Sequence, residues 1–102
     1  MEQAAPHMTR QIEDLLKAHD PTLASVEDTL TEGYARALAL EAERLRIERR
    51  LGEVARSATG DEAKELRSLG SRLRSADGEI AALRALLGTL HDRARTMRAA
   101  AR

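Results

Sequence analysis

Three histidines, His7, His19 and His91, are the residues best suited to bind a metal ion. A helical zinc site usually pairs two histidines one turn apart, so that both imidazoles lie on one helix face. These histidines are too scattered for that, and their acidic neighbours are those of an ordinary surface. The chain also has no cysteine, which excludes disulfides, thiolate nucleophiles and sulfur-ligated metals. We expect no metal site and no cofactor.

Acidic side chains could act as general acids or bases, but here they alternate with arginines. Between residues 41 and 56, four glutamates are interleaved with Arg44, Arg46, Arg49, Arg50 and Arg56. Such alternation is typical of a solvated helix face. The chain contains no glycine-rich phosphate loop, nucleophile elbow or buried-looking acid pair. We therefore expect a protein that is not an enzyme.

Arginines crowd the middle of the chain, and Arg46, Arg50 and Arg72 are the candidates for binding an anion. The planar fork of a guanidinium matches the oxygens of a phosphate. Zero net charge and a single aromatic residue, Tyr34, argue against a dedicated nucleic-acid binder. Binding of phosphate, nucleotide or nucleic acid is the alternative function.

Three helical segments are expected to position these residues. At 102 residues, with a third of them charged, the composition is that of long helices with a periodic seam. A short helix over about 9–19 places Met8, Ile12, Leu15, Leu16 and His19 at helical spacing, with Thr9 as a possible N-cap. Asp20-Pro21 ends it, because proline disfavours the helical conformation of the preceding residue.

Two long helices follow, over about 21–58 and 61–99, each with apolar residues alternately three and four positions apart. Asp20 can cap the first of them, with Pro21 in its first position. A turn at 59–61 separates them, where Gly60 can take the left-handed conformation and Asp61 can cap the second helix. Heptads sustained over this length are typical of a coiled coil.

An antiparallel register centred on Gly60 brings the two rows together and supports the turn independently. It pairs Gly33 with Leu87 and the seam's one charged residue, Arg44, with Ala76, so that small residues face large ones. The predicted core is Leu30, Leu40, Ile47, Leu51, Leu66, Leu69, Leu73, Ile80, Leu83, Leu87 and Leu90. Arg44 either extends to the edge of the seam or meets a buried acid from another chain.

The same register makes predictions about charge. It places acidic Glu27, Asp28 and Glu32 alongside Arg84, Arg93 and Arg95. These opposite charges would neutralise each other at the open end of the hairpin, which is the end farthest from the turn. Nearer the turn it predicts three like-charge pairs, Glu43 with Glu79, Arg50 with Arg72 and Glu41 with Asp77. Either these side chains spread into solvent or another chain supplies the opposite charges.

Apolar residues outside the seam form a possible partner face, Leu16, Tyr34, Leu38, Leu45 and Leu86. They could contact the N-terminal helix, a second copy of the chain, or both. The fold class we predict is all-α, an antiparallel coiled-coil hairpin with a short N-terminal helix, assembling into a dimeric helical bundle. It is a single domain, which we expect in the cytoplasm because no apolar run approaches a membrane span.

These features predict a non-enzymatic interaction protein, either a scaffold, an adaptor or a regulator. Its partners would be a second copy of itself, as a homodimer, and another protein. An assembly chaperone for a secreted or filamentous partner cannot be separated from this function by sequence.

Overall fold

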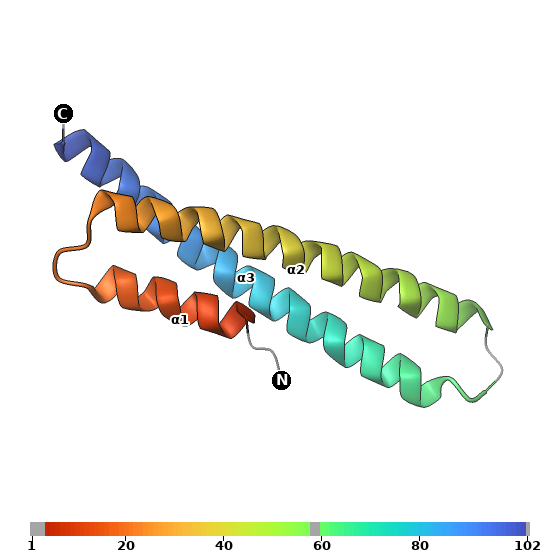
Figure 1. The fold of residues 1–102 in the computed structure, drawn as a ribbon. Coiled ribbons are helices and arrows are strands. Elements are labelled where there is room, and N and C mark those ends of the chain that lie inside the picture. The colour runs from red at the N-terminus through yellow and green to blue at the C-terminus, as the bar shows by residue number, and fades with distance from the viewer. Residues whose placement is uncertain (1–3, 58–59, 102) are drawn as a thin grey trace.

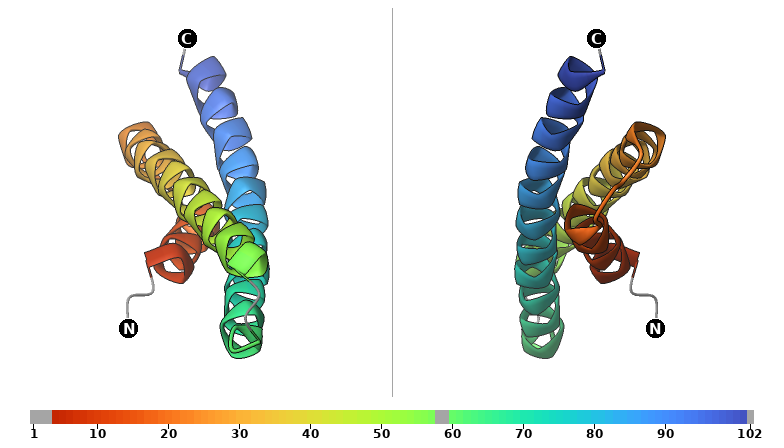
Figure 2. Two further views of the ribbon diagram at one scale, coloured as in Figure 1. Left: turned by 90° about the vertical axis from the view of Figure 1, so that its right-hand side faces the viewer. Right: turned by 90° about the vertical axis from the view of Figure 1, so that its left-hand side faces the viewer.

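The computed structural model describes residues 4–57 and 60–101, and these residues form three α-helices with no strand among them. In chain order they are α1 (Ala4–Lys17), α2 (Leu23–Ser57) and α3 (Ala63–Ala100). The helices α2 and α3 lie side by side and run in opposite directions (Figures 1 and 2). The protein is therefore all-helical and elongated, with extents of 64 × 22 × 16 Å.

The short helix α1 covers one half of this pair. It contacts both α2 and α3, and it lies against the half where α2 begins and α3 ends (Figure 1). The half that leads to the turn consists of α2 and α3 alone. The molecule is thus three helices thick at one end and two at the other, which leaves different surfaces exposed along its length.

The ends of α1 differ from the prediction. The helix begins at Ala4, five residues before the predicted start, so Thr9 lies inside it and is not its N-cap. Pro6 is compatible with this start, because a first-turn residue has no intrahelical acceptor for its N–H. The helix ends at Lys17, so His19 lies beyond it and is exposed.

The start of α2 also lies later than predicted, at Leu23. The backbone N–H of Ser25 donates to Oγ1 of Thr22 at 3.0 Å, and the N–H of Val26 donates to the carbonyl oxygen of Thr22 at 3.0 Å. This is the geometry of an N-cap. Thr22 therefore caps α2, so Asp20 is not the cap and Pro21 is not the first residue of the helix.

The turn between α2 and α3 depends on Gly60, whose φ of 100° lies in the left-handed region that favours glycine. The prediction for Gly60 is confirmed, whereas Ala58 and Thr59 lie outside the described residues. Asp61 is not the cap of α3, because the N-cap position is Glu62, which makes no side-chain capping bond. Instead the Glu62 carboxylate accepts a hydrogen bond from the backbone N–H of Gly60 at 3.0 Å.

The larger hydrophobic cluster lies in the three-helix half. Met8 and Ile12 of α1 are buried there against residues of both long helices. Of the predicted core, Leu30, Leu40, Leu83, Leu87 and Leu90 are buried in this cluster, and Ile80 packs against it. Each fully buried leucine or isoleucine contributes about 1.5–3 kcal/mol, so α1 is held by the same core that joins α2 to α3.

The smaller cluster lies between α2 and α3 near the turn. Ile47, Val54 and Leu69 are buried in it, and Leu51, Leu66 and Leu73 are half-buried around them. These partly exposed leucines follow from the two-helix thickness of this half, where no third helix covers the seam.

Gly33 of α2 lies beside residues of both α3 and α1. A Cβ added there would lie 2.5 Å from Cδ2 of Leu87 and 3.6 Å from Cδ1 of Ile12. Both neighbours are buried and cannot move away freely. The contact also matches the predicted facing of Gly33 and Leu87, so this glycine permits the close approach of α2 to α3.

We predict that Gly33→Ala lowers the free energy of unfolding by about 1 kcal/mol, because overpacking outweighs the gain in helix propensity. Gly88→Ala is the matched control, because an added Cβ at Gly88 would meet nothing within 4 Å. That variant should be up to about 1 kcal/mol more stable. Urea denaturation followed by circular dichroism measures both, and a stabilised Gly33→Ala would contradict the close packing.

Candidate protein interaction surface

One edge of the α2–α3 pair is joined by ion pairs. Arg98 contacts Glu27 at 2.9 Å and Arg84 contacts Glu41 at 2.8 Å. The glutamates are separated by two heptads, and so are the arginines. A heptad spacing keeps residues on the same flank of the seam. These two ion pairs were not among those predicted from the sequence, although the fourteen-residue spacing of both sets was a signal for them.

The predicted like-charge pair of Glu41 with Asp77 is wrong, because each of these residues has an opposite charge as its partner. Glu41 pairs with Arg84, and Asp77 accepts a hydrogen bond from Arg44. In the predicted pair of Arg50 with Arg72, both arginines line one pocket, and Arg50 contacts Glu65 at 3.0 Å. Its hydrogen bond to Glu65 raises the pKa of Arg50 above the usual value. Glu41, Asp77 and Arg50 therefore find opposite charges within the chain, and no second chain is needed to neutralise these three residues.

The third like-charge pair, Glu43 with Glu79, lies beside an arginine. Both glutamates and Arg72 line one shallow pocket between α2 and α3. The two carboxylates are therefore close to a positive charge in the same groove.

Arg44 extends from the seam to its edge, as one of the two predicted alternatives requires. Its side chain is 34% exposed, and it contacts Asp77 of α3 and Glu48 at 2.9 Å. The hydrogen bond with Asp77 raises the pKa of the Arg44 guanidinium, so it remains charged. The acid that Arg44 meets within the chain is exposed, and the alternative of a buried acid from another chain stays a prediction.

At the open end, charge neutralisation is only partial. Glu27 is paired with Arg98, and Arg93 donates a hydrogen bond to the carbonyl oxygen of Leu16 at 3.4 Å. Asp28 and Glu32 are exposed and form no ion pair with any residue that the structure describes. The predicted grouping of acids and arginines therefore holds for Glu27, with a different arginine.

The predicted partner face divides into two groups. Leu16 and Leu86 are half-buried and pack against the large cluster within the chain, so they do not belong to an open face. Tyr34, Leu38 and Leu45 are exposed by 38%, 64% and 46%. All three belong to α2, and they are the large hydrophobic residues exposed in the described part of the chain.

Leu38 and Leu45 belong to a second periodic row on α2. Counting by four and three along the helix gives five residues, all exposed, which we call the outer stripe: Thr31, Ala35, Leu38, Ala42 and Leu45. The spacing is that of a coiled-coil seam. In both views of Figure 2, α3 and α1 lie on two sides of α2 and no helix lies on its remaining side. The stripe thus has the pattern of a buried surface without a partner helix.

The three candidate anion-binding arginines do lie together. Arg46, Arg50 and Arg72 line a shallow pocket on the groove between α2 and α3, near the turn. Glu43 lines the same pocket, and Arg50 is already bonded to Glu65 and Glu53. Part of the positive charge is therefore balanced by acids of the same chain.

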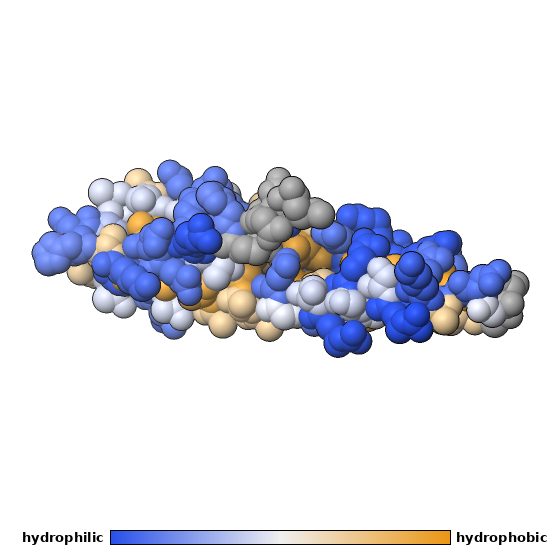
Figure 3. Space-filling view, turned by 90° about the horizontal axis from the view of Figure 1, so that it is seen from below, coloured by the Kyte–Doolittle hydropathy of each residue, from blue (hydrophilic) through white to orange (hydrophobic). Residues whose placement is uncertain are grey.

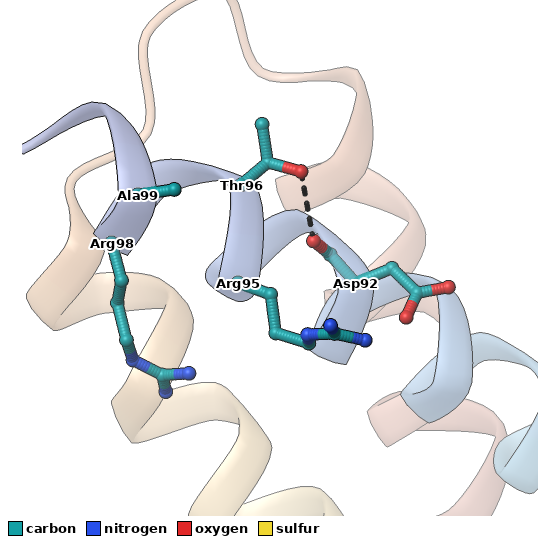
Figure 4. A pocket seen from close by; sticks show the side chains of 5 residues that line it. All are labelled: Asp92, Arg95, Thr96, Arg98 and Ala99. Atoms are coloured by element: carbon teal, nitrogen blue, oxygen red, sulfur yellow. Dashed lines mark hydrogen bonds between the residues drawn. The ribbon is translucent and has the colours of Figure 1, made fainter.

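Another hollow lies at the end of α3 and is shown in Figure 4. Its lining residues, Asp92, Arg95, Thr96, Arg98 and Ala99, all come from this one helix. The Thr96 hydroxyl donates to the backbone carbonyl of Asp92 at 3.1 Å, and Arg98 is engaged by Glu27. No catalytic group converges here from a second element.

His7, His19 and His91 are exposed, and they belong to α1, to the connection between α1 and α2, and to α3. His91 lies in a shallow hollow with Glu27 and Tyr34 at the ion-paired edge, as expected of a surface histidine near an acid. Across residues 4–57 and 60–101, no three histidine or acidic side chains are grouped so as to hold a metal ion.

The face shown in Figure 3 is largely hydrophilic, with smaller hydrophobic areas among the charged ones. Of the three helices described, none is both long enough and apolar enough to cross a bilayer. Comparison of the chain with protein-family models, with curated proteins and with solved structures finds no match. The function is therefore inferred from the surface of the protein itself.

We predict that Arg44→Leu raises the free energy of unfolding by about 1 kcal/mol. Leucine would fill the seam between Leu40 and Ile47, whereas the exposed ion pairs of Arg44 contribute little. Asp77→Asn is the control that removes the ion pair and keeps the seam. It should change the stability by less than about 1 kcal/mol. A marked loss of stability in Arg44→Leu would show that the charge itself supports the fold.

Proposed function

We propose that this protein is a non-enzymatic protein–protein interaction module, a scaffold, adaptor or regulator, that self-associates through its helices. In this proposal α2 and α3 form an antiparallel coiled-coil hairpin, and the hairpin presents an outer surface to a second copy and to another protein. The observation that carries the proposal is the outer stripe of α2, with Leu38 64% exposed.

The energetics of exposure support an association at this stripe. Fully burying one leucine side chain is worth about 1.5–3 kcal/mol, and a soluble monomer gains nothing from leucines at heptad spacing on its outside. The large cluster already contains the apolar face of α1, so α1 does not need the stripe. A helix from another chain would bury it.

The ionic edge supports a binding role over catalysis. Its acids and arginines are joined in pairs between α2 and α3, as Glu41 is with Arg84, so their charges neutralise each other and hold the helices together. The hollows described above are shallow and lined by helix surfaces. A protein with shallow hollows and exposed helix faces is better suited to binding another protein than to catalysis.

We predict that the chain is a dimer at tens of micromolar and that Leu38→Glu with Leu45→Glu makes it a monomer. Two charges on the stripe would oppose its burial, whereas both positions are exposed in the fold and the helices should remain intact. Ser71→Glu, at an exposed position of α3, is the matched control and should remain dimeric. Sedimentation equilibrium gives the mass of each, and a monomeric parent chain would contradict self-association.

The shared pocket of Arg46, Arg50 and Arg72 favours one second candidate, a regulator that binds phosphate, a nucleotide or nucleic acid. Two of these arginines, Arg46 and Arg72, form no ion pair with other described residues, so their guanidiniums can receive an anion. Glu43 in the lining weakens this candidate, which is why we rank it second.

For this second candidate we predict retention on heparin at low salt, lost in Arg46→Glu with Arg72→Glu. The charge reversal turns the pocket acidic, and binding to a polyanion falls steeply with positive charge. Arg67→Glu with Arg74→Glu, at exposed sites on α3 outside the pocket, makes the same change in net charge and is the control. If both variants elute with the parent chain, the pocket does not bind anions.

A further inference from the structure

The outer stripe can be matched against another helix in only a few ways. In the antiparallel pair within the chain, Gly33 faces Leu87, and the facing positions are offset in steps of one heptad. The same rule applies to the stripe of one copy packed against the stripe of a second copy. The possible registers therefore differ by seven residues, and each can be examined for what Leu38 and Leu45 would face.

One register places both leucines against small residues. In it Leu38 of each copy faces Ala42 of the other, and Leu45 faces Ala35. A slip of one heptad in one direction places Leu45 opposite Asp28, and a slip in the other direction places Leu38 opposite Arg49. Close packing favours the register in which both leucines meet small residues. In this register Arg49 faces the polar Thr31 at each end of the stripe, so no leucine faces a charge.

The charges beside the stripe suit this register. Glu32 and Arg46 are exposed, and neither has an ion pair with another residue in the described part of the chain. In the favoured register, Glu32 of each copy lies about 3 Å along the axis from Arg46 of the other, since two residues rise about 3 Å. Glu41 would approach its own copy near the twofold axis, but Arg84 already neutralises it. The contact is thus self-complementary in charge.

The position of the axis gives a further argument. The favoured register places the twofold axis at Leu40, which is the midpoint of α2 (Leu23–Ser57). The two α2 helices would therefore overlap along their whole length. All five residues of the stripe are exposed, so α1 and α3 do not cover the surface that the second copy would contact.

A parallel arrangement is less suitable. It would alternate Leu–Leu layers with Ala–Ala layers. Because leucine pairs need a larger distance between the helix axes than alanine pairs do, the layers could not all pack closely. It would also bring Glu48 of one copy toward Glu53 of the other. The antiparallel arrangement has neither defect.

We propose that the occupant of the outer stripe is a second copy of this chain, packed with α2 antiparallel to α2 about a twofold axis at Leu40. This inference rests on the proposed function, and it adds the surface, the direction and the register of the association. It makes the protein an isologous dimer, in which the same patch of each copy contacts the other.

The test is a complementation of charges in the stripe. Leu38→Glu and Ala42→Lys are made as separate variants, and each alone should dimerise more weakly than the parent chain. Mixed one to one, they place the introduced carboxylate of one copy against the introduced ammonium of the other and keep one native Leu38–Ala42 layer. The mixture should dimerise about tenfold more tightly than either variant alone, measured by sedimentation equilibrium.

Ala35→Lys is the matched control, because residue 35 faces Leu38 only in the slipped register. Its mixture with Leu38→Glu should not recover. The opposite pair, Leu38→Lys with Ala42→Glu, should recover as the first mixture does, and circular dichroism should show unchanged helix content since all these sites are exposed.

The outcomes separate this inference from the function on which it rests. If the parent chain is dimeric but neither charge pair recovers, or if the Ala35→Lys mixture recovers instead, the register proposed here is wrong and self-association stands. If the parent chain is monomeric at every concentration, both the register and the self-association are wrong.

Discussion

The burial of one apolar row of α2 against one apolar row of α3 is the constraint on which the rest of the structure depends. Leu83, Leu87 and Leu90 are almost completely buried, and they face residues of α2 from Val26 to Leu40 within one cluster. A chain with a single aromatic residue has few other means of excluding water. The direction of α3, the turn at Gly60 and the closeness of Gly33 to Leu87 all follow from aligning these two rows.

The position of α1 decides which surfaces remain. Met8 and Ile12 add to the core at one end, which leaves the seam near the turn half-covered and the outer stripe of α2 uncovered. The ion pairs do not oppose this arrangement, since they lie on the edge and hold α2 and α3 together. The proposed role in binding therefore follows from a difference in burial. One periodic row of α2 is buried within the chain, whereas the second row is exposed and available to a partner.

The periodic features of this fold could be predicted from the sequence. A helix that is buried on one side has apolar residues three and four positions apart, and this spacing is visible in the sequence. The rows through Leu30 and Leu83, and the left-handed Gly60, are of this kind. The helix ends could not be predicted as well, since Asp20 and Thr22 are both good caps and the backbone geometry selects Thr22. Ion pairs such as Arg50 with Glu65 depend on how far flexible side chains extend, and the heptad positions do not determine this.

The partner face was predicted only in part. Tyr34, Leu38 and Leu45 were identified by their spacing, whereas the burial of Leu16 and Leu86 depends on where α1 packs.

Small-angle X-ray scattering of the whole chain in solution tests the central claim most directly, because it reports length and mass together. The folded pair of helices predicts a particle close to the 64 Å length of one chain. Association through the middle of α2 predicts twice the mass of 11.2 kDa at nearly that same length. A particle of about 150 Å, the length of a hundred residues in one continuous helix, would contradict the turn at Gly60. A mass of one chain at all concentrations would contradict the association.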